Sequence, residues 1–307
     1  MQFGAHLPLI DFDGSGFATG DLAGYTDTAR QAGFDAIASN DHFVFQKPWL
    51  DGIVALASVV DRSGDMMLAT TVSLPVVRGP VALAKAAAAL DIISGGRLVL
   101  GVGPGSSARD YEAVGVPFEE RWPRLDEAVR VLRAHLNAAG PAFEGSFYDS
   151  KAPLQPRPSR SKGPPIWIGS WGSDAGLRRV ARLGDGWLAS AYNTTPELMA
   201  QGRDKLFAHL AEAGKDAASF PISLATMWTY VTSEAAKAAS MIGMLATMLN
   251  RDAPSVAAQV LIGPPEECAA KLRAYAEIGV QRVFIWPLAD PNTQLEIFTR
   301  DVSPSVR

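Results

Sequence analysis

Residues 90–105 read Leu-Asp-Ile-Ile-Ser-Gly-Gly-Arg-Leu-Val-Leu-Gly-Val-Gly-Pro-Gly, a stretch that predicts the end of a helix followed at once by a buried strand. Pro80 suits the first turn of this helix because no N–H is required there, and the helix should end where Gly95 or Gly96 adopts a left-handed conformation. Residues 97–100 then form an apolar run without polar alternation. Such a run is typical of a strand that is covered on both faces of a parallel sheet.

Three glycines, Gly101, Gly103 and Gly105, lie at the carboxyl end of this strand. They remove side chains from the carboxyl end of the strand, so we expect that a large flat group can approach the backbone there. The loop matches a dinucleotide-binding fingerprint only weakly, because Ser106 stands where a third glycine belongs and the loop follows the fourth predicted strand instead of the first.

The rest of the chain repeats the same joint between a helix and a strand. In residues 30–37, 182–188 and 276–283, a predicted helix ends at a glycine and an apolar strand begins at once. Repeated joints of this kind imply a parallel sheet with helices outside it. The predicted strands are 2–7, 36–39, 67–72, 98–102, 166–168, 186–190, 222–231 and 282–286.

These strands predict an α/β protein with the (β/α)8 TIM-barrel fold. The chain contains about eight strands separated by helices and exceeds the ~250 residues typical of that fold, so we expect a single domain over residues 1–307 with insertions after strands 4 and 7. A doubly wound sheet is the alternative. The first insertion, residues 143–165, is rich in proline and is expected to be a long surface loop.

The second insertion, residues 233–264, begins with a helical pattern in which Met241, Met244 and Met248 recur at helical spacing. A methionine stripe of this kind indicates packing in the core or against another subunit. It also fits a lid whose flexible side chains line a substrate pocket.

Composition and charge exclude several classes of function. The formal net charge of the 307 residues is −4, which argues against nucleic-acid binding because phosphates require a basic surface. Cys268 is the only cysteine and the chain has four histidines, so we expect no disulfide framework and no metal site. No apolar run reaches the ~20 residues that cross a bilayer, and the first residues do not read as a signal peptide. A cytoplasmic protein without membrane contact is expected.

Asp41 and His42 follow the second predicted strand. In a TIM barrel the active site lies at the carboxyl ends of the strands, which makes this pair a candidate. Imidazole titrates near neutrality and a neighbouring carboxylate tunes it, so the pair fits a catalytic base with its orienting partner, or a metal ligand. A histidine that caps a buried loop is the structural alternative.

Two further strand ends carry polar residues. Thr71, Val72 and Ser73 end the third strand, either as a plain turn or as an irregular backbone that faces a ligand. After the fifth strand, residues 169–174 read Gly-Ser-Trp-Gly-Ser-Asp and lead into a helix, whose free N–H groups favour an anion such as a phosphate. Ser173 or Asp174 acting as an ordinary N-cap is compatible with that interpretation.

Several of these segments resemble the bacterial luciferase-like monooxygenase family. The resemblance rests on residues 41–43, 90–103 and 111–121, with shorter matches at 165–169, 184–187 and 262–267. The matches follow one another along essentially the whole chain, and residues 90–103 are the most specific of them.

The resemblance implies a barrel that binds FMN or the deazaflavin coenzyme F420, as a homodimer. The Asp-His pair is similar to the F420-dependent branch, in which His42 would lie near the reactive carbon of the ring and Asp41 near its polar edge. In that branch the segment corresponding to Thr71, Val72 and Ser73 carries a non-proline cis peptide behind the ring. Two loops would hold the ring and phosphate regions: Gly103, Pro104, Gly105 and Ser106, and Gly169, Ser170, Trp171 and Gly172.

The chain departs from this branch in the loop after the fourth strand. Sugar-phosphate dehydrogenases of the branch carry a glutamate there as proton donor, whereas this chain has Ser106 and Ser107. A serine does not replace a tuned carboxylic acid, so a sugar-phosphate substrate is not expected. Basic residues of the first insertion either contact an anionic cofactor tail or belong to a solvated loop. They are Lys151, Arg157, Arg160 and Lys162.

The sequence therefore predicts an oxidoreductase that transfers hydride between coenzyme F420 and a small organic substrate. In such an enzyme the cofactor carries the difficult chemistry, and the protein supplies a slot, orientation and local electrostatics. The alternative is an FMN-dependent monooxygenase that uses reduced flavin and O2. A separate flavin or F420 reductase would be a partner. A non-catalytic flavin-binding protein and a metal-dependent hydrolase that uses Asp41 and His42 are further hypotheses.

Overall fold

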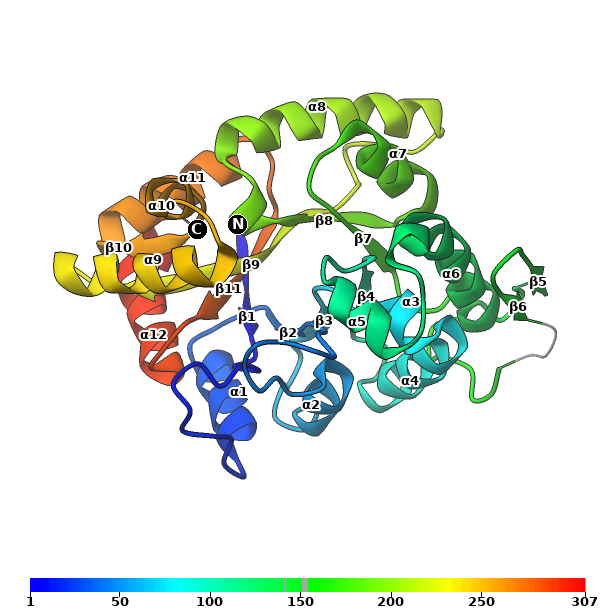
Figure 1. The fold of residues 1–307 in the computed structure, drawn as a ribbon, viewed down its shortest axis with the longest axis horizontal. Helices are drawn as coiled ribbons and strands as arrows, with labels where there is room; N and C mark the ends of the chain where they lie inside the picture. Colours follow the sequence, from blue (N-terminus) through cyan, green and yellow to red (C-terminus); the bar gives the residue numbers. More distant parts are fainter. Residues whose placement is uncertain (141, 151–153, 307) are drawn as a thin grey trace.

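The computed structural model describes residues 1–140, 142–150 and 154–306. Parallel strands close into an eight-stranded barrel with helices around it (Figure 1). The barrel strands are β1 (Gln2–His6), β2 (Ala36–Ser39), β3 (Met67–Thr70), β4 (Leu98–Val102), β7 (Ile166–Ser170), β8 (Gly186–Ser190), β9 (Ile222–Val231) and β11 (Arg282–Pro287). They pair in this order, and β11 pairs again with β1, so the predicted (β/α)8 fold is confirmed.

Three short strands lie outside the barrel. The strand β10 (Leu261–Gly263) extends the sheet beside the carboxyl end of β9, and β5 (Phe143–Glu144) pairs with β6 (Asp149–Ser150) as a separate hairpin. The helices are α1 (Asp21–Gln31), α2 (Gly52–Ser58), α3 (Pro75–Arg78), α4 (Pro80–Ile93), α5 (Ala108–Ala113), α6 (Arg121–Leu136), α7 (Asp174–Leu183), α8 (Pro196–Glu212), α9 (Ala235–Leu249), α10 (Ala253–Gln259), α11 (Pro265–Glu277) and α12 (Pro291–Ile297). Within the described ranges, no helix is both long and apolar enough to cross a lipid bilayer.

The glycine joints between helices and strands have two different causes. Gly95 and Gly96 have φ of 64° and 81° after α4, and Gly33 and Gly279 adopt the same left-handed region, as predicted. Gly184 differs, because its φ is −92°. An added Cβ at Gly184 would come within 2.9 Å of Ile168, so glycine is required there for close packing and not for its backbone angles.

The inside of the barrel is filled by large side chains that lie over glycines of other strands. An added Cβ on Gly4 would come 2.3 Å from Phe284, and one on Gly186 would come 2.5 Å from Trp167. The interior cluster consists of Ala36, Ala38, Ala69, Val99, Trp167, Leu188, Ala225 and Phe284. The barrel is therefore a packed core, which leaves its chemistry to the loops beyond the strand ends.

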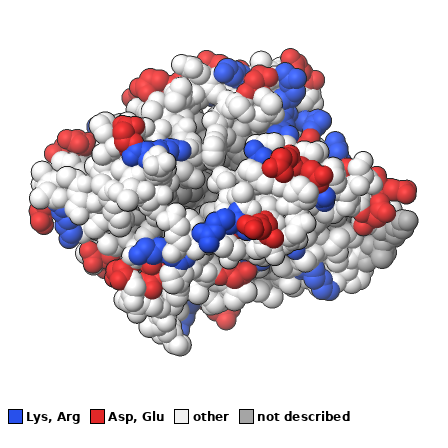
Figure 2. Space-filling model, in the orientation of Figure 1, with Lys and Arg blue, Asp and Glu red and all other residues white. Residues whose placement is uncertain are grey.

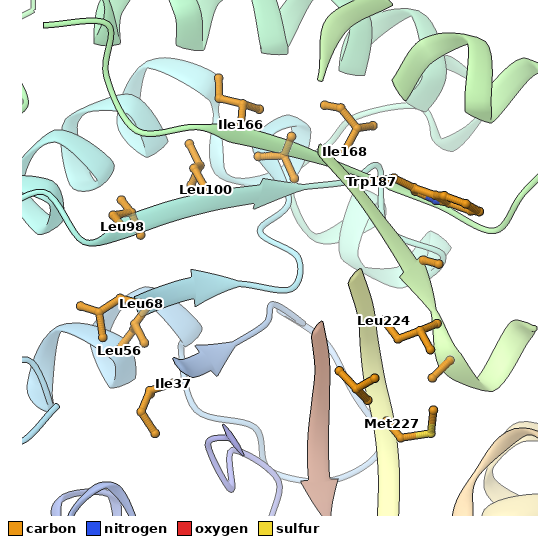
Figure 3. Packing of buried hydrophobic residues seen from close by; sticks show 14 of the residues in the cluster. Ile37, Leu56, Leu68, Leu98, Leu100, Ile166, Ile168, Trp187, Leu224 and Met227 are labelled. Carbon is orange, nitrogen blue, oxygen red and sulfur yellow. The ribbon is translucent and has the colours of Figure 1, made fainter. Parts of the chain in front are cut away.

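Alternate residues of the strands belong to a second, larger cluster between the barrel and its helices. Ile37, Leu68, Leu98 and Ile166 pack in this cluster with helix residues such as Leu56 of α2 (Figure 3). Both faces of β4 are thus buried, as the apolar residues before Gly101 predicted.

The segment between α6 and β7 lies at the amino ends of the strands. The Arg160 side chain binds Asp91 at the end of α4 and the carbonyl of Leu98 at the start of β4, and Arg157 donates to the carbonyl of Asn137 at 3.1 Å. These contacts hold Arg157 and Arg160 far from the strand ends where a cofactor was expected, so they do not support the suggested contact with a cofactor tail. Lys162 is exposed, and Lys151 lies outside the described residues.

Candidate active site

His42 lies directly after β2, and its imidazole is held by Asp110. Nδ1 of His42 is 2.9 Å from Oδ2 of Asp110. The ring packs against Trp49 and Phe45, with 4.7 and 5.0 Å between ring centroids, and 20% of the His42 side chain is exposed. Because Nδ1 is occupied, Nε2 is the ring nitrogen that is left for a ligand.

Asp110 belongs to α5, which follows the glycine-rich loop after β4. Its side chain is 1% exposed, and Oδ1 accepts hydrogen bonds from the amides of Phe43 at 3.0 Å and Val44 at 2.7 Å. Burial alone would raise the pKa of the Asp110 carboxyl, but the hydrogen bonds with His42 and the two amides outweigh burial and lower this pKa. One carboxylate therefore fixes both the imidazole and the loop that carries it.

The sequence did not predict this role for Asp110. The two partners are 68 residues apart, and their contact depends on how the barrel closes. An acidic residue in the first turn of a helix after a strand-end loop is the only local signal.

Asp41 has a different partner from the one expected. Its carboxylate accepts two hydrogen bonds from Arg78, both 2.6 Å long, and one from the amide of Leu74 at 3.1 Å. Arg78 also binds Asp51, the N-cap of α2, at 2.7 Å. Asp41 therefore ties the end of β2 to α2 and α3. The expectation that Asp41 orients His42 is corrected, since Asp110 does so.

The segment after β3 connects three strand ends. The Thr71–Val72 peptide bond is cis, as the family resemblance implied. The Asp41 amide donates to the carbonyl of Val72 at 3.1 Å, and the Ser73 amide donates to the carbonyl of Gly101 at 2.8 Å. The ends of β2, β3 and β4 are thereby held together.

The Val72 side chain fills space that two glycines leave. An added Cβ on Gly103 would come 2.9 Å from Val72, and one on Gly169, in β7, would come 3.1 Å from it. At Gly105 the corresponding neighbour is Leu74, at 3.0 Å. Gly103 and Gly105 therefore make room for the side chains of Val72 and Leu74, which belong to the segment after β3. The sequence had indicated that this room would be left for a flat ligand.

The loop after β7 is open to solvent. Trp171 is 59% exposed, and an added Cβ on Gly172, whose φ is 92°, would have no neighbour within 4 Å among the described residues. Ser173 accepts a hydrogen bond from the amide of Gly176 at 3.2 Å, which confirms it as the N-cap of α7. A small cavity of about 100 Å³ borders this loop, and Lys205 lines it together with Trp171 and Gly172. A cation thus lies beside the loop that was expected to bind phosphate.

Three other residues of the expected loop set differ in their surroundings. The carbonyl of Pro104 accepts a hydrogen bond from the hydroxyl of Tyr111, which fixes this part of the loop. Ser106 is exposed, and Ser170 is buried beneath the loop after β7.

Aromatic side chains extend the site from His42 towards β1 and β11. The Trp49 ring lies 5.7 Å from that of Trp286, and the His6 ring stacks on Trp286 at 3.7 Å. Nδ1 of His6 is 2.8 Å from the carbonyl of Leu7, and burial lowers the pKa of His6 to about 3. His6 is therefore neutral at physiological pH. This aromatic group was not predicted, because its members come from three distant parts of the chain.

Several buried polar atoms around these strand ends have no hydrogen-bond partner within the described part of the chain. They include Oγ of Ser39 and Ser73 and the indole nitrogens of Trp49, Trp228 and Trp286. Buried polar groups are nearly always paired in native proteins. We therefore regard these strand ends as the place that receives the polar atoms of a ligand.

The sequence profile of the luciferase-like monooxygenase family matches residues 10–254. The chain belongs to this family. As a luciferase-like protein with dehydrogenase relatives, it is an enzyme of the oxidoreductase class.

Relatives of this luciferase-like protein match it over nearly their whole length. An F420-dependent glucose-6-phosphate dehydrogenase from Kineococcus radiotolerans is 29% identical over 95% of this chain and 94% of the relative. An F420-dependent hydroxymycolic acid dehydrogenase from Mycobacterium tuberculosis is 26% identical over 95% of this chain and 86% of the relative.

A solved structure shares the fold of the whole chain. It is an F420-dependent secondary alcohol dehydrogenase in complex with an F420-acetone adduct, with a TM-score of 0.87 at 19% identity, and the match covers 100% of this chain and 99% of the other. At that identity the likeness shows the common fold.

Proposed function

We propose that this enzyme uses coenzyme F420 and transfers hydride between the coenzyme and a small organic substrate. Relatives of nearly equal length whose names state F420 dependence support the choice of cofactor. The observation that carries the proposal is the histidine after β2, His42, which Asp110 holds so that Nε2 is free for a ligand.

The groups at the strand ends fit a deazaflavin ring. The unpartnered hydroxyls of Ser39 and Ser73 would bind polar atoms at the edge of the ring, and the side chain of Val72 offers an apolar surface to its face. When bound, the coenzyme supplies the hydride chemistry, and the protein supplies position and electrostatics.

The two loops that the family resemblance singled out would hold the rest of the coenzyme. In our proposal Gly169, Ser170, Trp171 and Gly172 surround the phosphate region, with Lys205 as the nearby cation. The loop after β4, with Gly103, Pro104, Gly105 and Ser106, borders the ring, and Thr71 and Ser73 fix the segment behind it.

We assign different roles to His42 and Asp41. His42 is the proposed catalytic residue, because Nε2 can exchange a proton with the substrate while Asp110 fixes the ring and balances its charge. Asp41 is a proposed positioning residue. Through Arg78 and the amide of Leu74, it holds the segment that presents Val72.

A titration with each cofactor tests the proposal. Purified protein is titrated separately with coenzyme F420 and with FMN while the fluorescence of the cofactor is followed. We expect micromolar binding of coenzyme F420 and much weaker binding of FMN. Micromolar binding of FMN with no binding of coenzyme F420 would reverse the assignment in favour of the FMN-dependent monooxygenase.

A further inference from the structure

A cleft of about 650 Å³ lies beside the aromatic side chains that lead to His42. Its walls are the loop after β1, the start of α1, the loop after β11 and the helix α9. Trp286 lines the cleft, its ring is 5.7 Å from that of Trp49, and Trp49 packs against His42 at 4.7 Å. Two packed aromatic side chains, those of Trp286 and Trp49, therefore separate the cleft from His42.

Much of the cleft wall is apolar. Met241 and Met244 of α9 line it from one side, and Ile10, Phe12 and Phe17 line it from the loop after β1. Met244 is 36% exposed and Phe17 is 39% exposed, so both present apolar surface to the cleft. Methionine and aromatic side chains adapt readily to an apolar ligand. This placement favours the substrate-pocket interpretation of the methionine stripe.

The charged side chains that line the cleft are all acidic, and no lysine or arginine is among the lining residues in the described ranges. They are Asp11, Asp13, Asp21 and Asp290. Asp11 and Asp13 accept hydrogen bonds from loop amides, at 2.8 Å from Gly14 and 3.0 Å from Ser15. Carboxylates of this kind repel a phosphate or carboxylate on a ligand, because like charges at close range are unfavourable.

Two of the residues that line the cleft carry buried hydrogen-bond donors without partners. Nε1 of Trp286 and the hydroxyl of Tyr25 have no acceptor within the described residues, and both side chains are 1% exposed. An oxygen atom of an uncharged ligand would satisfy such a donor at no electrostatic cost.

We propose that this cleft receives the substrate, and that the substrate is an uncharged, largely apolar molecule with a hydrogen-bond-accepting oxygen. The inference rests on the proposed function, because the reacting end of the molecule has to reach His42. It separates this enzyme from its relatives named as glucose-6-phosphate dehydrogenases, whose substrate carries a phosphate. The serine at position 106, in place of an acidic proton donor, agrees with this difference.

Binding of matched probes to protein with methyl-labelled methionine tests the inference. The probes are 2-heptanone, 6-oxoheptanoate and glucose 6-phosphate, added with coenzyme F420 present, and the signals of Met241 and Met244 are assigned with single Met→Leu variants. We expect 2-heptanone to shift both signals and the two anions to shift neither. Equal or stronger shifts with an anion, or no shift with 2-heptanone, would overturn the inference.

A variant that places a positive charge in the cleft provides a second test. Met244→Lys should strengthen binding of 6-oxoheptanoate by about fivefold, the size expected for one partly exposed charge pair. It should weaken binding of 2-heptanone, because a charge replaces apolar surface of the cleft. Ile93→Lys is the matched control, because Ile93 is 57% exposed at the end of α4 and does not line the cleft. Equal effects of the two variants would contradict the proposed site. Coenzyme fluorescence in the same samples reports separately on the proposed function, which fails if coenzyme F420 does not bind.

Discussion

His42 illustrates how a distant residue decides what an active-site side chain can do. The Asp110 carboxylate occupies Nδ1 and also binds the amides of Phe43 and Val44, so the imidazole and its loop move together. A buried carboxylate in this position favours the tautomer that carries its proton on Nδ1. Nε2 is then an acceptor, which suits a group that takes a proton from a substrate.

Asp110→Asn should change this tautomer with little effect on the fold. The amide oxygen can still accept from Phe43 and Val44, while its NH2 group would donate to Nδ1 of His42 and shift the imidazole proton to Nε2. We expect F420-linked turnover to fall about 100-fold, within the range of a general acid–base contribution. The binding of coenzyme F420 should change little, because the hydrogen bonds of Asp110 are with His42 and the two loop amides.

Nitrogen NMR of the histidines measures the tautomer directly, and the chain has only four histidines to assign. Asp126→Asn is the control, because Asp126 pairs with Arg179 and Arg182 away from the site. A wild-type His42 tautomer and wild-type turnover in Asp110→Asn would refute the positioning role.

His6 should make stability depend on pH in the acidic range. Its folded pKa is about 3, whereas a histidine in the unfolded chain titrates near 6.5. Between these values the unfolded chain binds the extra proton, so stability falls as the pH drops below about 6.5. The free energy of unfolding should fall by about 1.4 kcal/mol for each unit that the pH drops in this range.

Denaturant unfolding at pH 7 and pH 5 checks this prediction. Between pH 7 and pH 5, the free energy of unfolding of His6→Gln should fall by about 2 kcal/mol less than that of wild type. His209→Gln should behave in the opposite way, because hydrogen bonding to Asp174 raises the pKa of His209 and makes its protonation stabilising. Identical pH profiles for wild type and His6→Gln would show that His6 is not buried as a neutral group.

At the scale of elements, the segment after β3 determines the shape of the site. Val72 lies against Gly103 of the β4 loop and Gly169 of β7, so three strand ends meet at one side chain. Asp41 and Arg78 hold this segment from the other side. The position of Val72 therefore depends on small residues in two neighbouring elements.

Gly103→Ala should displace Val72. The new Cβ would come 2.9 Å from Val72, which is too close, so the segment has to shift. We expect a loss of about 1–3 kcal/mol in the free energy of unfolding, as for other overpacked sites. The affinity for coenzyme F420 should fall by at least about tenfold if Val72 supports the ring, which corresponds to ~1.4 kcal/mol.

Gly24→Ala is a suitable control for that substitution. Gly24 lies in α1, and an added Cβ has no neighbour within 4 Å in the part of the chain that the structure describes. Alanine should therefore stabilise the helix by up to about 1 kcal/mol and leave cofactor binding unchanged. Titration of both variants, followed by cofactor fluorescence, measures their affinities for coenzyme F420. Wild-type affinity in Gly103→Ala would argue against a role for Val72 behind the ring.

The elements themselves were well predicted because their signals are local. Four of the eight barrel strands, β2, β4, β8 and β9, have the predicted bounds, and the other four differ by one or two residues at one end. Apolar runs and glycine joints fix such strands within a few residues of sequence.

The contacts of the site were predicted less well than the elements. A missing side chain at Gly103 is visible in the sequence, but that Val72 fills the space depends on the closed barrel. The same holds for Asp110 and for the stacking of His6 on Trp286, whose partners are far apart in the chain. The residue types in the sequence indicated that the site lies at the strand ends. Which residues contact one another there depends on the fold.

At the scale of the whole molecule, the groups that stabilise the barrel and the groups of the proposed site lie in different regions. Its interior is filled by the cluster that contains Trp167 and Phe284, and the amino ends of the strands carry structural ion pairs such as that of Arg160 with Asp91. In the view of Figure 2, basic and acidic side chains are interspersed over the surface, and a hollow lies near the centre. The unpartnered hydroxyls of Ser39 and Ser73 and the larger cleft lie towards the carboxyl ends of the strands.

A crystal structure of the protein with coenzyme F420 tests the central claim most directly. We predict that the deazaflavin ring lies at the carboxyl ends of β2, β3, β4 and β7, with one face against Val72 and Nε2 of His42 on the side of the reactive carbon. A ring bound elsewhere, or a ring whose reactive carbon lies out of reach of His42, would contradict the account.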